Sequence, residues 1–191
     1  MEHLRSLLGS VVVLSAALTL SACAGDEADS AHSLSAALPH STGGVTPLGD
    51  ADVASKTHRP EAPSQLVVTD VRLGTHDGFD RVVFDLEGEG KPGWFVDYTV
   101  APARQGSVYP IEVEGNEFLS VNIDGIVFPD DIGIDDPQLT TTPGVGNITE
   151  VVNTGVFEGR NRFIVGLDNE SPYSVQILED PLRIVIDIIY H

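Results

Sequence analysis

The sequence predicts an all-β domain, a sandwich or a barrel of short strands, behind an exported N-terminus. Three observations support this prediction. From about residue 65, short segments rich in Val, Ile, Phe, Tyr and Thr alternate with Gly, Pro, Asn and Asp. No stretch of ten residues there keeps the apolar period of a helix. Residues 1–22 have the layout of an export signal, in which Arg5 precedes the apolar run from Leu7 to Leu20. That run is too short for a comfortable membrane span, so we interpret it as a signal-peptide core.

The cysteine that follows the signal is the only one in the chain. Leu20-Ser21-Ala22-Cys23 resembles the bacterial lipobox, which implies that Cys23 is lipidated and becomes the first residue of the mature protein. Two acyl chains on one diacylglycerol suffice for stable anchoring. Ala22-Cys23-Ala24 also fits ordinary signal peptidase, which would release a secreted protein, and a buried lone thiol is a third interpretation. A single cysteine cannot form an intrachain disulfide, so the folded part depends on its own core.

The residues after Cys23 predict a disordered tether that runs to residue 64. Residues 24–64 are rich in Ala, Ser, Thr, Gly and Pro, contain no aromatic residue and show no hydrophobic periodicity. Such a composition buries too little apolar surface to offset its ordering entropy. The predicted organisation is therefore a signal peptide at 1–22, a lipidated cysteine and tether at 23–64, and one folded domain at 65–191.

The chain is strongly acidic, with a net charge of −19. Loss of residues 1–22 removes one acid, Glu2, and one base, Arg5, so the mature chain keeps this charge. Nucleic-acid binding needs Lys and Arg to neutralise phosphates, and anionic lipid would repel the protein body. We expect no nucleic-acid partner. Solubility outside the cell is the simplest explanation of the charge, and cation binding is the alternative.

Eight strands are predicted in the domain, each bounded by turn-forming residues. Glu158–Asn161 is typical of a hairpin turn, Glu87–Gly93 is predicted to be a break, and Pro129–Gly146 is predicted to be a long acidic loop. The strands are Leu66–Leu73, Arg81–Glu87, Trp94–Ala101, Phe118–Ile123, Ile148–Phe157, Arg162–Asp168, Tyr173–Leu178 and Leu182–Tyr190.

Two of these strands share the pattern Arg-aliphatic-Val-apolar-Asp, at residues 81–85 and 183–187. Alternation places Val82, Phe84 and Leu86 on one face of the first strand, and Ile184, Ile186 and Ile188 on one face of the second. If the strands are antiparallel neighbours with Val83 opposite Val185, then Arg81 faces Asp187 and Arg183 faces Asp85. Both charge pairs would then be matched across the ladder.

Three segments together resemble the AMIN domain, and more closely its actinobacterial AMIN-like relatives. They are 71–85 (VRLGTHDGFDRVVFD), 92–98 (PGWFVDY) and 180–187 (DPLRIVID). The resemblance covers essentially all of residues 65–191. It implies a small β-sandwich of two sheets that serves as a non-catalytic envelope-targeting module associated with peptidoglycan. No catalytic domain accompanies the module in this sequence.

The residues give little sign of catalysis or of a cofactor, so we expect neither. Zinc hydrolases need three or four clustered ligands, but the predicted domain holds only His76 and His191, and no Gly-x-Ser-x-Gly motif presents a serine. Catalysis by a pair of carboxylates remains an alternative, because so acidic a chain always contains possible pairs. The acidic loop invites a calcium interpretation through Asp130, Asp131, Asp135 and Asp136, although its spacing differs from the EF-hand, and a solvated loop is the simpler interpretation.

A binding surface is the sharper hypothesis. His76, Arg81, Trp94 and Tyr98 could together bind a saccharide or a peptide, because aromatic faces stack on sugars and Arg binds carboxylates. The structural interpretation makes Trp94 a core residue and Arg81 half of an ion pair. We expect a non-enzymatic, lipid-anchored, extracytoplasmic protein that binds peptidoglycan or an envelope protein. The alternatives are an enzyme or regulator of cell-wall metabolism acting with a partner, and a solute- or calcium-binding lipoprotein.

Overall fold

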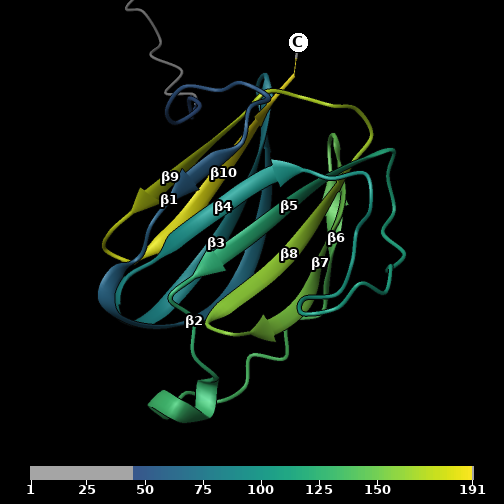
Figure 1. Ribbon diagram of the computed structural model, residues 1–191. Helices are drawn as coiled ribbons and strands as arrows, with labels where there is room; N and C mark the ends of the chain where they lie inside the picture. The colour runs from purple at the N-terminus through teal and green to yellow at the C-terminus, as the bar shows by residue number, and fades with distance from the viewer. Residues whose placement is uncertain (1–44, 191) are drawn as a thin grey trace, which may run out of the picture. The chain divides into compact units, whose positions relative to one another are not determined.

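The computed structural model describes residues 45–190, and these form an antiparallel β-sandwich (Figure 1). The predicted signal peptide, Cys23 and residues 24–44 of the predicted tether lie outside the described residues. The strands are β1 Lys56–His58, β2 Glu61–His76, β3 Phe79–Lys91, β4 Gly93–Tyr98, β5 Glu117–Asp124, β6 Thr141–Val145, β7 Ile148–Phe157, β8 Arg160–Leu167, β9 Tyr173–Leu178 and β10 Arg183–Ile189; a 3₁₀ turn, η1, covers Pro129–Ile132. The described residues contain no helix with the length and hydropathy needed to cross a bilayer.

The strands divide into two sheets, which confirms the predicted all-β sandwich. One sheet has six strands in the order β1-β4-β5-β8-β7-β6, and the other has four in the order β2-β3-β10-β9. All eight predicted strands are present, whereas β1 and β6 were not predicted. Both are short edge strands, and Pro143 and Gly144 in β6 are residues that usually mark a turn.

The predicted break at Glu87–Gly93 is wrong, because β3 continues to Lys91 and only Pro92 separates it from β4. Glycines make this extension feasible. Gly88 and Gly90 adopt φ values of 122° and 96°, and a Cβ on either would collide with the backbone of the opposite strand, at Gln65 and at Pro63. The turn-forming composition therefore marks an irregular pairing with a register shift in β2 rather than an end to the strand.

Residues 45–64, which the sequence assigned to the tether, contribute β1 and the first residues of β2 to the sandwich. β1 pairs with β4, and Asp52 exchanges two backbone hydrogen bonds with Tyr173. The Leu48 amide donates to Asp187, and the Leu48 carbonyl accepts from Ser174. Residues 45–58, which we call the N-terminal segment, are held largely by backbone groups, and composition does not reveal such contacts.

The register of β3 and β10 is the one that the repeated pattern predicted. The strands are antiparallel with Val83 opposite Val185, so Arg81 faces Asp187 and Arg183 faces Asp85. Arg81 donates to both Asp187 oxygens, at 2.6 and 2.8 Å. The carboxylate of Asp85, however, is bound by Arg72 of the neighbouring β2, at 2.6 and 2.8 Å, and not by Arg183.

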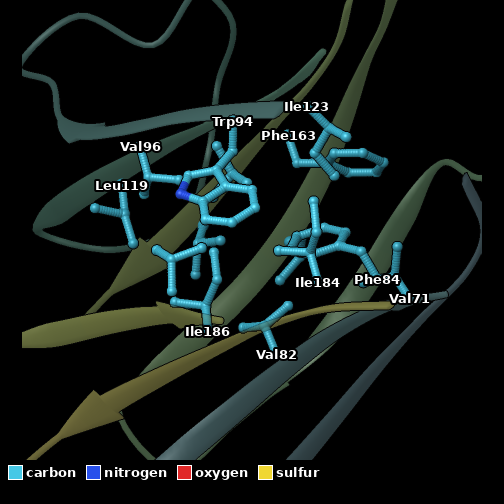
Figure 2. Close-up of a cluster of buried hydrophobic side chains, with 14 of the residues drawn as sticks. Val71, Val82, Phe84, Trp94, Val96, Leu119, Ile123, Phe163, Ile184 and Ile186 are labelled. Carbon is cyan, nitrogen blue, oxygen red and sulfur yellow. The ribbon is translucent and has the colours of Figure 1, made fainter. Parts of the chain in front are cut away.

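The core lies between the two sheets, and Figure 2 shows side chains of both sheets pointing toward one another there. The inward residues predicted for β3 and β10 are all buried in it, including Phe84 and Ile186. Phe84 packs on Phe163 of the other sheet with ring centroids 4.8 Å apart. Because this interface uses one face of each sheet, the opposite face of the six-stranded sheet is available for other contacts.

Candidate functional site

The four residues predicted to bind a ligand do not share one groove. Trp94 is only 8% exposed and packs in the core, where its ring stacks on His58 with centroids 4.6 Å apart. Tyr98 is partly buried, and its hydroxyl donates to the Ser171 carbonyl at 2.7 Å and accepts from the Ser171 amide at 3.0 Å. Burial raises the pKa of Tyr98, so the phenol stays neutral at physiological pH.

The other two predicted residues belong to the four-stranded sheet. His76 stacks on Phe79 with centroids 4.6 Å apart, and the Arg81 guanidinium lies 5.2 Å from the centroid of the same ring. Arg81 is committed to Asp187, which is fully buried. Within residues 45–190, neither His58 nor His76 makes a side-chain hydrogen bond to a serine or a carboxylate, so a catalytic triad is not assembled there.

The carboxylates of the acidic loop, residues 129–146, are not clustered. Asp131 accepts a hydrogen bond from the Phe128 amide at 3.1 Å and caps η1, and Asp136 accepts from the Gln138 amide at 2.8 Å. Within residues 45–190, no group of three or more His, Cys, Asp or Glu side chains is arranged to hold a metal ion. A calcium site at the carboxylates of 130, 131, 135 and 136 therefore stays a sequence prediction.

A groove does open on the outer face of the six-stranded sheet, opposite the core. Its volume is about 320 Å³. A shallow, open depression adjoins it at Arg162, which lines both. We call the two together the outer groove. Its lining comprises Phe95, Asp97, Tyr98, Thr99, Ala101, Ala103, Gly106, Ser107, Val108, Tyr109, Ser120, Asn122, Arg160, Arg162 and Ile164.

Strand alternation explains why β8 contributes two arginines to this groove. Phe163, Val165 and Leu167 point into the core, so the alternate residues Arg160 and Arg162 point outward. The strand follows a tight hairpin whose two central residues, Glu158 and Gly159, have φ values of 48° and 77°. Positive φ at both positions is typical of the two-residue turn that suits the twist of a hairpin.

The connection between β4 and β5, residues 99–116, covers part of the same face. It passes on the right-hand side of Figure 1. Its far end is fixed to β7, where the Glu114 amide donates to the Glu150 side chain at 2.6 Å and the Glu114 carbonyl accepts from Thr149. Gly166 lies beneath it, and a Cβ there would collide with the Glu114 carbonyl oxygen. The loop thus forms one wall of the outer groove.

The charges in the outer groove differ from those of the rest of this acidic chain. Arg160 is neutralised, because it donates to both oxygens of Asp124 at 2.6 and 3.0 Å, which raises the pKa of Arg160. Arg162 instead donates from Nε to the Asn122 amide oxygen at 2.8 Å. Burial, and then the nearby charge of Arg160, lower the pKa of Arg162. Among the described residues Arg162 is therefore the cation of the groove that has no ion-pair partner, and Asp97 is the carboxylate that lines the same groove.

The sequence contained a signal for this site that composition alone does not reveal. Arg160 and Arg162 stand two residues apart in a chain with only 10 basic residues, so any strand through them places both on one face. Asn122 gave no such signal. Its role depends on β5 lying beside β8, where it is opposite Arg162.

Two further cavities lie elsewhere on the sandwich. One of about 580 Å³ is lined by polar residues that include Asn147, Asp168 and Glu170. Asp80, which is fully buried, accepts from the Asn147 amide at 2.6 Å, and its other oxygen has no partner in the described part of the chain. The other cavity, of about 360 Å³, is mainly apolar and lies under the acidic loop. Neither lining includes a cationic side chain.

Comparisons with known proteins place the chain in a family. No curated protein matches the chain, and no solved structure matches it. The family model of the AMIN-like domain matches residues 66–190. That range runs from within β2 to the residue after β10 and includes every residue of the outer groove. The chain belongs to the AMIN-like domain family.

Proposed function

We propose that this protein is a non-enzymatic, lipid-anchored module of the cell envelope that binds peptidoglycan through the outer groove. AMIN-like domains are of the non-catalytic, envelope-targeting type, which supports both the location and the non-enzymatic role. Cys23 supplies the anchor, and the chain beyond it presents the domain to the wall. A peptidoglycan strand offers sugar rings, amides and carboxylates to such a groove.

The observation that carries this proposal is the combination of side chains in the outer groove. Two exposed aromatic rings, Phe95 at 40% and Tyr109 at 77% exposure, line the same outer groove as the cationic Arg162. Ser120 and Asn122 add hydrogen-bonding groups. Rings that present a face to solvent are suited to stack on sugars, and aromatic residues and Arg dominate binding hot spots.

Co-sedimentation of residues 24–191 with purified sacculi tests the proposal. We expect saturable binding that the double variant Phe95→Ala, Tyr109→Ala weakens about five- to thirty-fold, the loss that corresponds to about 1–2 kcal/mol. Phe128→Ala is a matched control, because Phe128 is 59% exposed but lines a different cavity. Equal binding by the double variant and the control would contradict the proposal that the outer groove binds peptidoglycan. No binding by the unaltered chain would contradict the peptidoglycan ligand and favour an envelope protein as the partner.

The anchor is tested separately. The intact mass of the mature N-terminus distinguishes a diacylglyceryl-modified Cys23 from ordinary cleavage within Ala22-Cys23-Ala24. We expect the lipidated form in the membrane fraction and a Cys23→Ser variant that carries no lipid. An unmodified N-terminus would make the protein a secreted one and would leave the groove proposal intact.

A further inference from the structure

Arg162 differs from the other hydrogen-bonded arginines of the sandwich. Arg72, Arg81 and Arg160 each bind a carboxylate, of Asp85, Asp187 and Asp124 respectively. Within residues 45–190, Arg162 has no carboxylate within ion-pair distance, although the chain carries 29 acidic residues. A sequence with so many acidic residues could easily place a carboxylate beside Arg162. The Arg162 guanidinium nevertheless has no such partner in the described part of the chain.

Arg162 is held in place by a neutral group rather than by a charge. Its Nε donates to Asn122, which is 2% exposed. The Asn122 amide nitrogen in turn donates to the Phe95 carbonyl at 3.0 Å and to the Ser120 hydroxyl at 3.2 Å. These two bonds fix which end of the amide faces Arg162. The guanidinium is therefore oriented in advance, while its terminal Nη1 and Nη2 have no hydrogen-bond partner in the described part of the chain.

The surroundings leave the charge of Arg162 incompletely compensated. The side chain is half-buried, Arg160 stands two residues away on the same face, and Asp124 is already engaged by Arg160. Burying a charge without a partner is unfavourable, and a planar guanidinium with both terminal nitrogens free matches an oxyanion in a bidentate geometry. Arg162 also lines both parts of the outer groove, so an anion can approach from either.

We propose that Arg162 is the anion-binding residue of the outer groove, and that the ligand is an acidic glycopeptide whose oxyanion it takes through Nη1 and Nη2. Phe95 and Tyr109 stack on the rings beside that oxyanion. This inference rests on the proposed function and specifies its ligand chemistry. We assign this oxyanion to the carboxylates of peptidoglycan, and a phosphate of another wall polymer is the outcome that would overturn the assignment.

The decisive experiment compares residues 24–191 with two variants on three sacculus preparations. Arg162→Gln removes the guanidinium. Arg59→Gln makes the same change of charge at an exposed arginine outside the groove. The sacculi are untreated, amidated with carbodiimide and ammonia to neutralise carboxylates, or stripped of phosphate polymers with hydrofluoric acid. We expect Arg162→Gln to weaken binding to untreated sacculi about tenfold and Arg59→Gln to leave it unchanged.

The chemical treatments identify the source of the oxyanion. Amidation should weaken binding of the unaltered chain about tenfold, and Arg162→Gln should then cause no additional loss, because its partner has already been removed. The same pattern on phosphate-stripped sacculi would instead assign a phosphate. If Arg162→Gln binds untreated sacculi as tightly as the unaltered chain does, the inference is wrong even though the proposed function stands.

A soluble probe tests Arg162 without any variant and without sacculi. N-acetylmuramic acid and N-acetylglucosamine differ by a lactyl ether that carries a carboxylate. Titration of the ¹⁵N-labelled chain should shift the Arg162 Nε–Hε resonance with the acid and not with the neutral sugar. If both sugars leave that resonance unmoved, Arg162 serves only to support Asn122. Failure of sacculus binding together with a shift by the acid would overturn the proposed function and retain the anion site.

Discussion

Arg81 and Asp187 face each other across β3 and β10 and form a bidentate ion pair in which the carboxylate is fully buried. The pair also connects the four-stranded sheet to the N-terminal segment. The Leu48 amide donates to Asp187 at 2.6 Å, and Arg81 donates to the Thr46 carbonyl at 3.3 Å. One ion pair therefore joins three parts of the chain that are far apart in sequence.

Asp187→Ala should destabilise the domain substantially. The substitution leaves the half-buried Arg81 guanidinium and the Leu48 amide without their acceptor, and loss of one partner of a buried pair costs about 3–5 kcal/mol. Urea unfolding monitored by the fluorescence of Trp94, the only tryptophan, measures the loss. Asp85→Ala is the control, because its partner Arg72 is half exposed and such pairs contribute about 0–1 kcal/mol. Similar losses for both variants would contradict the importance of burial.

A chain that begins at residue 65 should be less stable than one that begins at residue 45. The shorter chain lacks the pairing of β1 with β4, both backbone bonds between Asp52 and Tyr173, and the Leu48 contacts. Each buried hydrogen bond contributes about 1 kcal/mol, so we expect a loss of several kcal/mol or failure to fold. Thermal unfolding of the two purified chains provides the comparison. Equal midpoints would restore residue 65 as the boundary of the folded unit.

Alkaline pH should weaken the fold through its buried tyrosines. Burial raises the pKa of Tyr173, whose hydroxyl donates to the Ala54 and Val96 carbonyls, and burial also raises the pKa of Tyr98. Above about pH 10 the unfolded chain loses these protons while the folded chain keeps them. Stability is therefore full below that pH and falls above it, with Tyr173 contributing up to about 1.4 kcal/mol per pH unit.

Urea unfolding between pH 7 and pH 11.5 measures this slope. Tyr173→Phe should be less stable at pH 7, because the buried Val96 carbonyl and the Ala54 carbonyl lose their donor, yet its stability should decline less steeply above pH 10. An unchanged slope in the variant would show that the alkaline loss comes from other groups.

Gly166→Ala should loosen the loop that walls the outer groove. The new Cβ would collide with the Glu114 carbonyl oxygen, so residues 99–116 must shift away from the sheet. Trypsin cleavage after the exposed Arg104 should then accelerate several-fold. Gly74→Ala is the matched strand control, because a Cβ there meets only the His76 ring, at a contact distance of 3.4 Å. Equal cleavage rates for the two variants would mean that the loop does not rest on Gly166.

The sequence predicted those parts of the fold that depend on alternation. Val82, Phe84, Ile184 and Ile186 have the period of a strand with one face in a core, and the repeated Arg and Asp even specified how β3 and β10 align. The same pattern did not predict that Asp85 would bind Arg72. That choice depends on which strand lies on the other side of β3, and β2 supplies a guanidinium at the diagonal position.

Amino-acid composition could not predict the contacts that are made by backbone groups. Residues 56–58 have no apolar alternation, yet β4 offers them unpaired edge groups, and the ring of Trp94 stacks on that of His58. Of the four residues predicted to bind a ligand, Tyr98 lines the outer groove and the other three do not. Trp94 and Arg81 were selected by residue type, but each is committed to a structural contact, whereas Arg162 has its significance only once Asn122 lies beside it.

The docked N-terminal segment also sets how far from the membrane the groove can operate. With Cys23 lipidated, only residues 24–44 separate the bilayer from the folded unit, and even a fully extended chain of that length covers roughly 75 Å. A tether that continued to residue 64 would cover roughly 140 Å. If Cys23 carries the proposed lipid anchor, docking of residues 45–58 therefore about halves the distance from the bilayer that the groove can reach.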